Sequence, residues 1–215
     1  VLAATAIAHE GEAQEEKAPP EDEEQPWRKG RAGTSIGRAV HAVLQTIDLE
    51  SGKGVNDAAK AQTVAEGIPG EAGRVARLAA NAFESGAVRE AVASGRYWRE
   101  VYVGTEIEGA TVEGFIDLLY EGPRGLVVVD YKTDSVATDV QIEEALARYR
   151  LQGAAYALAL EKAVVRPVAE VRFVFTEPKR EEPIPDLEAA KQDVIAMIPK
   201  VLASRGPGAT PPNGA

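Results

Sequence analysis

The sequence predicts an α/β fold in which helices flank a mixed central β-sheet. The chain has 215 residues, of which 45% are hydrophobic and 27% charged, enough for one globular domain with a sizeable core. Three segments with helical periodicity come first, and three strand-like segments follow them. A long helix, a fourth strand and a closing helix complete the pattern. This order favours a mixed sheet with helices on both faces.

Three helices are expected in the first half of the chain, over residues 34–49, 71–86 and 87–95. Thr34 or Ser35 can cap the first helix, and each of the other two ends at a glycine. Apolar residues in the first helix recur at helical spacing, which is typical of a helix that packs one face against a core. This stripe consists of Ile36, Val40, Val43, Leu44 and Ile47.

Strands are expected over residues 99–107, 110–120 and 125–132. The turn EGPRG separates the last two strands and predicts that they form an antiparallel hairpin. A long helix over residues 139–162 then leads to a strand over residues 168–175. The apolar character of this fourth strand predicts a buried place at the centre of the sheet.

The closing helix is expected over residues 186–205, with Asp186 as its cap. Residues 1–32 are rich in Glu, Ala and Pro and lack hydrophobic periodicity, which predicts an acidic disordered linker. Residues 206–215 are rich in Gly and Pro and are expected to form a flexible tail. The folded domain is therefore expected over residues 33–205.

The net charge of −10 is unevenly distributed, because residues 1–26 contain eight acidic residues and a single lysine. An acidic domain is a poor autonomous binder of nucleic acid, since affinity for the phosphate backbone comes mainly from Lys and Arg. Any function on nucleic acid would then depend on a local site, a metal ion or a partner. The chain contains no Cys, which excludes disulfides, thiolate zinc sites and iron–sulfur clusters.

No apolar run approaches the ~18 residues of a membrane helix, so no membrane association is expected. The lack of Cys fits a reducing, cytoplasmic setting. The chain begins with Val, as expected for a piece of a longer protein, and it contains no GxxxxGK[ST] loop of a helicase motor.

The stretch GLVVVDYKTDS places an acid and a base at the end of a buried strand. Because side chains alternate along a strand, Asp130 and Lys132 share one face and Tyr131 points to the other. Counting from the turn places Asp117 opposite Asp130, or one residue away. Two facing carboxylates destabilise a sheet unless something compensates, and they suit Mg²⁺ or Mn²⁺. The alternative is a solvated hairpin whose lysine pairs with both aspartates.

Two helices carry further candidates. His41 borders the apolar stripe of the first helix, one turn after Gly37, where open space is expected. Gln152 and Tyr156 are four residues apart and project from one face of the long helix. Taken alone, His41 also fits a packed or surface residue, and Tyr156 fits a core residue with Gln152 as its polar neighbour.

Two glutamates of the first two strands are weaker candidates. Glu100 begins a strand and could complete a metal site or serve as a solvated acid. Glu113 shares the face of Asp117 by parity but lies farther from the turn, and is expected to be structural.

The chain resembles the PD-(D/E)XK nuclease superfamily, and within it the RecB-like nuclease domain at the C-terminus of bacterial helicase–nucleases such as RecB and AddA. The resemblance covers about residues 33–177. It rests on motifs that occur in the family's order, namely GTSIGRAVHAVLQ, VEGFIDLLYEGPRGLVVVDYKTDS and YRLQGAAYALALE. It implies a restriction-endonuclease-like core. Some relatives carry a four-cysteine iron–sulfur cluster, which this chain cannot form.

The resemblance implies a divalent-metal site for Mg²⁺ or Mn²⁺. Its ligands would be the side chains of His41, Asp117 and Asp130 and the carbonyl of Tyr131. Lys132 would lie beside the attacking water and complete a catalytic set with the two aspartates.

The resemblance also implies DNA as the substrate, with Gln152 and Tyr156 placing the DNA strand and Glu100 as an accessory acid. The expected function is a metal-dependent DNA nuclease, exonucleolytic or end-processing, that acts in recombinational repair with a helicase motor. The alternatives are a catalytically silent nuclease-fold scaffold or DNA-binding module, and a free-standing nuclease that acts without a helicase, for instance in defence.

Overall fold

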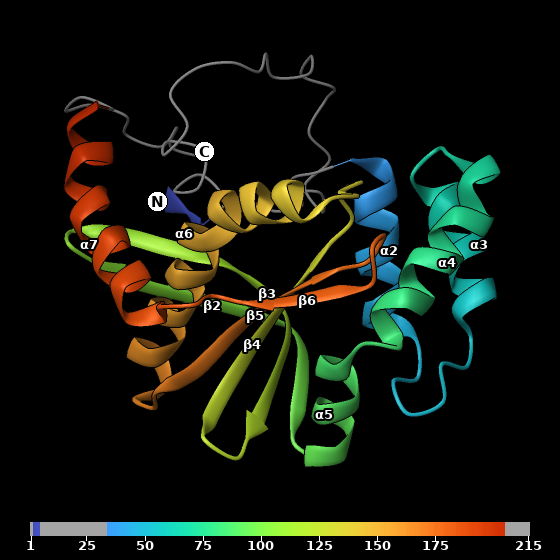
Figure 1. Ribbon diagram of the computed structural model, residues 1–215, viewed down its shortest axis with the longest axis horizontal. Helices are drawn as coiled ribbons and strands as arrows, with labels where there is room; N and C mark the ends of the chain where they lie inside the picture. Colours follow the sequence, from blue (N-terminus) through green and yellow to red (C-terminus); the bar gives the residue numbers. More distant parts are fainter. Residues whose placement is uncertain (1, 5–33, 205–215) are drawn as a thin grey trace, which may run out of the picture.

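The structure is a computed structural model that describes residues 2–4 and 34–204 (Figure 1). Its elements follow in the order β1 Leu2–Ala3, α2 Ser35–Thr46, α3 Val55–Ala65, η2 Pro69–Glu71, α4 Ala72–Phe83, α5 Gly86–Ser94, β2 Tyr97–Ile107, β3 Ala110–Gly122, β4 Gly125–Lys132, α6 Asp139–Val164, β5 Val168–Phe175, β6 Arg180–Pro183 and α7 Leu187–Ser204. Among these described residues, no helix has both the length and the apolar character that crossing a membrane requires.

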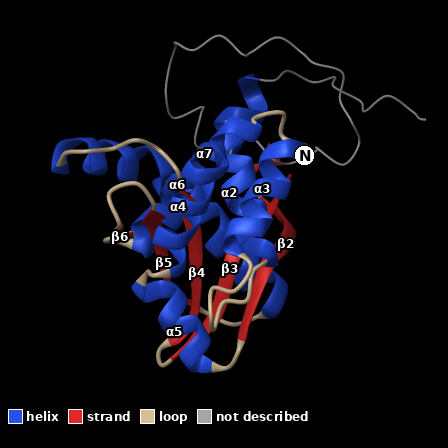
Figure 2. Cartoon of the chain, turned by 90° about the vertical axis from the view of Figure 1, so that its right-hand side faces the viewer, coloured by secondary structure: helices blue, strands red, loops and turns tan. Residues whose placement is uncertain are grey.

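The strands form one mixed sheet, as predicted. The order is β1-β3-β4-β5-β6, and β2 also pairs with β3. Figure 2 shows β2, β3, β4 and β5 side by side. Strands β2, β3 and β4 form an antiparallel meander, whereas β4 and β5 are parallel and are joined across one face by α6. The predicted hairpin of β3 and β4 is therefore confirmed, as is the interior position of β5.

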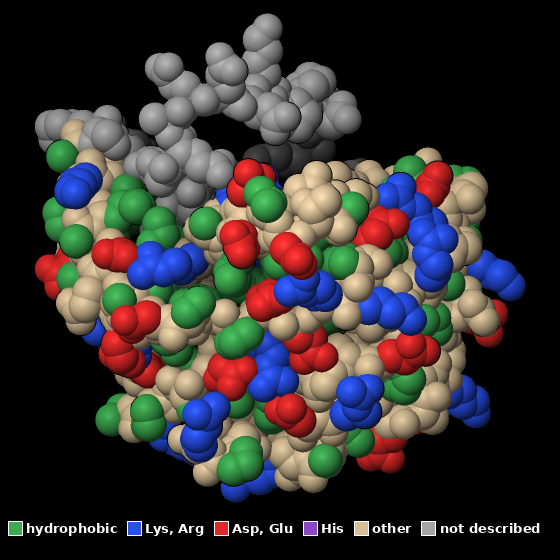
Figure 3. Space-filling model, in the orientation of Figure 1, with side chains coloured by type: hydrophobic (Ala, Val, Ile, Leu, Met, Phe, Trp, Pro, Cys, Tyr) green, Lys and Arg blue, Asp and Glu red, His purple; other side chains and the backbone are tan. Residues whose placement is uncertain are grey.

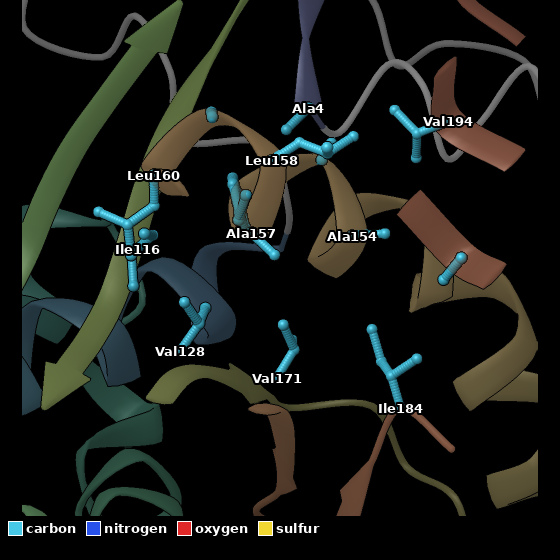
Figure 4. Close-up of a cluster of buried hydrophobic side chains, with 14 of the residues drawn as sticks. Ala4, Ile116, Val128, Ala154, Ala157, Leu158, Leu160, Val171, Ile184 and Val194 are labelled. Carbon is cyan, nitrogen blue, oxygen red and sulfur yellow. The ribbon is translucent and has the colours of Figure 1, made fainter. Parts of the chain in front are cut away.

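Two hydrophobic layers cover the sheet. On one face, α6 packs on the strands and α7 packs against α6. Side chains such as Leu160 and Val194 belong to the same buried cluster as Ile116, Val128 and Val171 (Figure 4). The other layer joins α2, α4 and α5 to the opposite face of the same strands. Its members include Val40, Val43, Leu78, Val88, Leu118 and Val129. The chain thus places helices on both faces, as the apolar periodicity predicts.

Side chains cap the starts of α2, α6 and α7, whereas Gly86, expected to end the second helix, instead begins α5 after α4 has ended at Phe83. The Thr34 hydroxyl accepts a hydrogen bond from the Gly37 amide at 3.1 Å and begins α2. The Asp186 carboxylate accepts one from the Ala189 amide at 2.9 Å before α7. Thr138 and Gln141 form a reciprocal capping box at the start of α6.

Helix α3 and strand β6 have no clear signal in the sequence. In α3 only Ala59 and Thr63 are buried, so the helix lacks the broad apolar stripe that periodicity detects. Strand β6 has the sequence REEP, whose residues are poor strand formers, and it exists because it pairs with the edge of β5. Both elements therefore form because of tertiary contacts, and local sequence preference does not predict them.

The expected linker over residues 1–32 needs a correction at its start. Leu2 and Ala3 pair in parallel with Val112 and Glu113 of β3, and Leu2 is only 1% exposed. Strand β4 pairs with β3 over residues 118–122 only, so β1 covers an edge that β4 leaves open. Residues 5–33 and 205–215 lie outside the described residues, so the rest of the linker and the tail stay predictions.

Helix α6 approaches the sheet closely at Gly153. A Cβ atom there would lie 2.8 Å from Cγ1 of Val171 and 2.9 Å from Cζ of Phe173. Gly153→Ala should therefore lower the free energy of unfolding by about 1–2 kcal/mol, because overpacking outweighs the gain in helix propensity. Urea unfolding monitored by circular dichroism measures the change.

A matched control is Gly73→Ala in α4, where a Cβ atom meets nothing within 4 Å. This substitution should leave stability unchanged or raise it by up to about 1 kcal/mol. Equal effects of the two substitutions would contradict the close approach of α6 to the sheet.

Candidate active site

The hairpin of β3 and β4 brings two aspartates together. Leu118 lies opposite Val129, so the next position away from the turn sets Asp117 against Asp130. One carboxylate oxygen of Asp117 accepts a hydrogen bond from the amide of Tyr131 at 2.8 Å. Asp130 is only 4% exposed. Two acidic side chains therefore meet at the buried end of a core strand.

Burial is the main cause that raises the pKa of Asp130, to about 7. The nearby Asp117 raises it further, whereas the Lys132 ammonium opposes the shift. The Oδ2 atom of Asp130 is buried and accepts no hydrogen bond from the part of the chain that the structure describes. It lies 2.6 Å from the Lys132 Nζ atom, with which it forms a buried ion pair. The Lys132 ammonium is therefore the charge that partly compensates this buried carboxylate.

His41 approaches the two aspartates from α2, in the layer that also contains α4 and α5. Its Nδ1 atom lies 2.8 Å from Oδ1 of Asp117. Burial disfavours the charged imidazole, but the Asp117 carboxylate outweighs burial and raises the pKa of His41 to about 9. Burial likewise favours neutral Asp117, yet the interaction with His41 lowers the pKa of Asp117 below its usual value. The two groups form an ion pair in the absence of a competing cation.

Arg99 fixes the position of the helix that carries His41. The Nη1 atom of Arg99 donates hydrogen bonds to the carbonyls of Leu44 at 3.1 Å and Ile47 at 2.7 Å. These carbonyls lie at the end of α2, where a helix leaves acceptors unpaired. The guanidinium therefore ties α2 to β2, next to Glu100.

Glu100 joins the cluster through an unusual backbone conformation. It lies inside β2 with φ 50°, a left-handed geometry that non-glycine residues rarely adopt. Tyr97 before it packs against the layer of α2, whereas Val101 and Val103 after it pack against the layer of α6. The strand thus changes the layer that it contacts at Glu100. Such strain persists only where the surroundings enforce it.

The donor atoms fit a divalent cation. Ligand atoms of His41, Glu100 and Asp117 all lie within 4.8 Å of one another. The buried side chain of Asp130 adds a third carboxylate beside this group. Carboxylate oxygens with one imidazole are ligands that Mg²⁺ and Mn²⁺ accept. A bound cation would offset the repulsion between the carboxylates. Without a cation, protonation of Asp130 relieves that repulsion.

Lys132 lies at the centre of a second set of contacts. Its ammonium donates a hydrogen bond to the Gln152 side-chain oxygen at 2.9 Å, and the Gln152 amide donates to the Tyr156 hydroxyl at 2.9 Å. Gln152 and Tyr156 are each 5% exposed. The ring of Tyr156 fits because β3 has a glycine there: a Cβ atom on Gly114 would lie 2.5 Å from the ring. Gln152 thus contacts Lys132 directly, and Tyr156 is linked to it through Gln152.

Two residues near Lys132 were not among the sequence candidates. The Nζ atom lies 3.8 Å from the centre of the Tyr149 ring, and the Tyr149 hydroxyl donates to the Asp134 carboxylate at 2.9 Å. Burial, and then the charge of Asp134, raise the pKa of this hydroxyl, which keeps it a donor. The spacing of Tyr149 from Gln152 places both on one stripe of α6, and this signal could have revealed it.

Two other expectations can be compared with the structure. Glu113 lies outside the cluster and accepts a hydrogen bond from the Tyr102 hydroxyl at 2.9 Å, in keeping with a structural role. The open space expected at Gly37 is absent, because a Cβ atom there would lie 3.0 Å from the Thr133 hydroxyl oxygen. Gly37 instead lets the end of β4 approach α2 closely.

Comparisons with known proteins place this chain in a family. Residues 13–210 match the model of the PD-(D/E)XK nuclease superfamily. An ATP-dependent helicase/nuclease subunit from Desulforudis audaxviator is 36% identical over 172 residues, which cover 68% of this chain and 13% of that protein. The protein of the same name from Bacillus cereus is 29% identical over 178 residues, covering 69% and 14%. The chain thus spans about one seventh of the length of these relatives.

The fold has a counterpart among solved structures. The crystal structure of a protein named as a candidate exonuclease from Eubacterium rectale aligns with a TM-score of 0.54 at 14% identity, covering 82% of this chain and 69% of that chain. At this identity the likeness concerns the fold alone. With most of its residues matched by the family model, and with the expected carboxylates side by side on one hairpin, the chain belongs to the PD-(D/E)XK nuclease superfamily.

Proposed function

We propose that this domain hydrolyses phosphodiester bonds in DNA with a bound Mg²⁺ or Mn²⁺ ion. The observation that carries the proposal is the meeting of Asp117, Asp130 and Lys132 at one buried strand end, with one Asp130 oxygen left without a hydrogen bond. The stability of the fold alone does not require such a cluster, because it combines burial with like-charge repulsion. It suits a site that gains a cation and an anionic substrate.

The metal would be held by His41, Asp117, Asp130 and the carbonyl of Tyr131, with Glu100 as an accessory acid. When bound, a divalent ion polarises the phosphate and lowers the pKa of a coordinated water.

The other groups act on the substrate. Lys132 supplies a fixed positive charge beside Asp130, where it stabilises negative charge that develops on the attacking oxygen and the phosphate. Gln152 and Tyr156 lie behind Lys132 and place the DNA strand relative to it.

We propose that a helicase motor, on the same chain or on a partner, delivers the DNA. Several proteins similar to this chain are named helicase/nuclease subunits, and the chain matches only a small part of their length. The face drawn in Figure 3 has no continuous basic surface for DNA, because acidic and basic side chains interleave there. Such a partnership fits exonucleolytic or end-processing work in recombinational repair in the cytoplasm.

A cleavage assay tests the proposal. End-labelled single-stranded and double-stranded DNA should be cut when Mg²⁺ or Mn²⁺ is present and should stay intact with a chelator. The same ions should raise the melting temperature, because a ligand that binds only the folded state stabilises it.

Glu113→Gln is the matched control, since this carboxylate lies on the same strand as Asp117 but outside the cluster. The variant should cut as well as the wild type. A folded wild-type protein that binds DNA but never cuts it would instead support the silent scaffold.

A further inference from the structure

The ammonium of Lys132 is enclosed on three sides. Asp130 Oδ2 lies 2.6 Å away, the Gln152 oxygen 2.9 Å away, and the face of the Tyr149 ring meets it at 3.8 Å from the ring centre. An ammonium group has three N–H donors, and the one hydrogen bond described for this group goes to Gln152, so the ion pair and the ring supply the rest of its surroundings. The side chain of Lys132 is 10% exposed, and little water competes for the same donors.

The Tyr149 ring is itself held in place. Its hydroxyl donates to both oxygens of the Asp134 carboxylate, at 2.9 and 3.0 Å. The ring also packs against Phe173 of β5, with 6.0 Å between ring centres. Asp134 follows Lys132 by two residues, so the ring is tied to the same segment whose lysine it contacts. The aromatic face is therefore a fixed part of the surroundings of Lys132.

We propose that Tyr149 is a positioning residue, which holds the Lys132 ammonium with the face of its ring while Asp134 orients that ring through the hydroxyl. The attraction between an ammonium and an aromatic face has no proton acceptor, so it constrains the lysine without removing its charge. Asp130 and Gln152 alone would let the flexible side chain move away from the metal site. This inference depends on the proposed nuclease function, to which it adds Tyr149 as the residue that positions Lys132.

The first test is spectroscopic and needs neither metal nor DNA. In the NMR spectrum of the wild-type protein, the ring current of Tyr149 should shift the Hε protons of Lys132 upfield of those of exposed lysines. Lys132→Arg assigns the signal by its loss. Tyr149→Phe loses the hydrogen bonds to Asp134 but keeps the packing against Phe173, so it should retain most of the shift, whereas Tyr149→Leu should abolish it. Lys132 Hε protons at ordinary positions in the wild type would overturn the proposal, whatever the variants do.

The second test is kinetic and uses a substrate that the wild-type domain cuts. Tyr149→Leu should lower kcat about tenfold with KM little changed, because the ring acts through Lys132. Tyr149→Phe should recover most of the rate, since it keeps the aromatic face. A rise in KM alone in Tyr149→Leu, or an equal loss of kcat in both variants, would overturn the proposal.

The control is Tyr120, another buried tyrosine whose hydroxyl donates to a carboxylate, that of Glu90, at 2.6 Å. Tyr120 packs in the opposite layer, away from Lys132. Tyr120→Leu should lower stability and leave kcat unchanged at temperatures where the protein is folded. A wild-type protein that cuts no DNA would refute the nuclease function, whereas the NMR shift reports on the ring and lysine in either case.

Discussion

Replacing Asp130 by asparagine should lower the rate of metal-dependent cleavage at least about a thousandfold while the protein stays folded. The carboxylate of Asp130 is the one that burial and Asp117 together drive toward the neutral form, with a pKa raised to about 7. Asparagine keeps the shape and the Lys132 neighbour but cannot supply a negative ligand oxygen. The variant should therefore lose metal binding and the charge neutralisation that the metal provides, whereas the packing of the site should change little.

Two measurements separate these effects. Single-turnover cleavage gives the rate, and the rise of the melting temperature with Mn²⁺ reports on metal binding. Asp130→Asn should lose both, whereas Glu113→Gln should keep both. Without metal, the variant should unfold at a temperature close to that of the wild type, because the lost ion pair with Lys132 is offset by the removal of repulsion from Asp117. Cleavage by Asp130→Asn at a near wild-type rate would remove Asp130 from the site.

Replacing Lys132 by methionine should lower the cleavage rate by about a hundredfold to a thousandfold and spare metal binding. Methionine fills much of the same space, so the core contacts of the lysine stem are largely retained. The ammonium competes with a metal ion for the charge of Asp130, which it approaches to 2.6 Å. Its removal should leave the metal-induced rise in melting temperature intact or larger. The contrast with Asp130→Asn distinguishes the role of the lysine from that of the ligands.

Lys191 provides a matched control for the lysine. It is another buried lysine, with a side chain 6% exposed and ion pairs to Glu161 and Glu188, and it lies in α7 away from the metal ligands. Lys191→Met should reduce stability without changing the rate of cleavage by folded protein. If both methionine variants slowed cleavage equally, loss of a buried charge, and not a specific role of Lys132, would explain the result.

The local signals in the sequence predict most of the fold. Helical spacing gives α2, α4, α5, α6 and α7, and strand-like runs give β2 and β5. The apolar runs with the turn EGPRG give β3 and β4 in their observed pairing. Periodicity could not reveal β1, because Leu2 and Ala3 depend on an edge of β3 that exists only in the folded sheet. It also could not reveal β6, whose charged residues form a strand only beside β5.

In the candidate site, too, local patterns predict some of the contacts and not others. Alternation along β4 correctly places Asp130 and Lys132 on one face, and the hairpin register sets Asp117 beside them. The contacts of His41 with Asp117 and of Lys132 with Gln152 join residues far apart in the sequence, so local patterns do not predict them. The order of the family's motifs does indicate these residues. The left-handed backbone at Glu100 follows from packing, which no local pattern encodes. Helical spacing places Tyr149 on the stripe of Gln152, but the contact of its ring with Lys132 depends on how α6 packs on the sheet.

Helix α6 carries Tyr149 and Gln152, which contact Lys132, and Tyr156, which contacts Gln152, so one helix supplies much of the surroundings of this lysine. A small slide or rotation of that helix would displace all three side chains together. The lysine would then lose its orientation in a single step, even while the strands remain paired. If the domain is a nuclease as proposed, heat or a neighbouring protein could abolish cleavage by moving α6 away from the sheet before the whole domain unfolds.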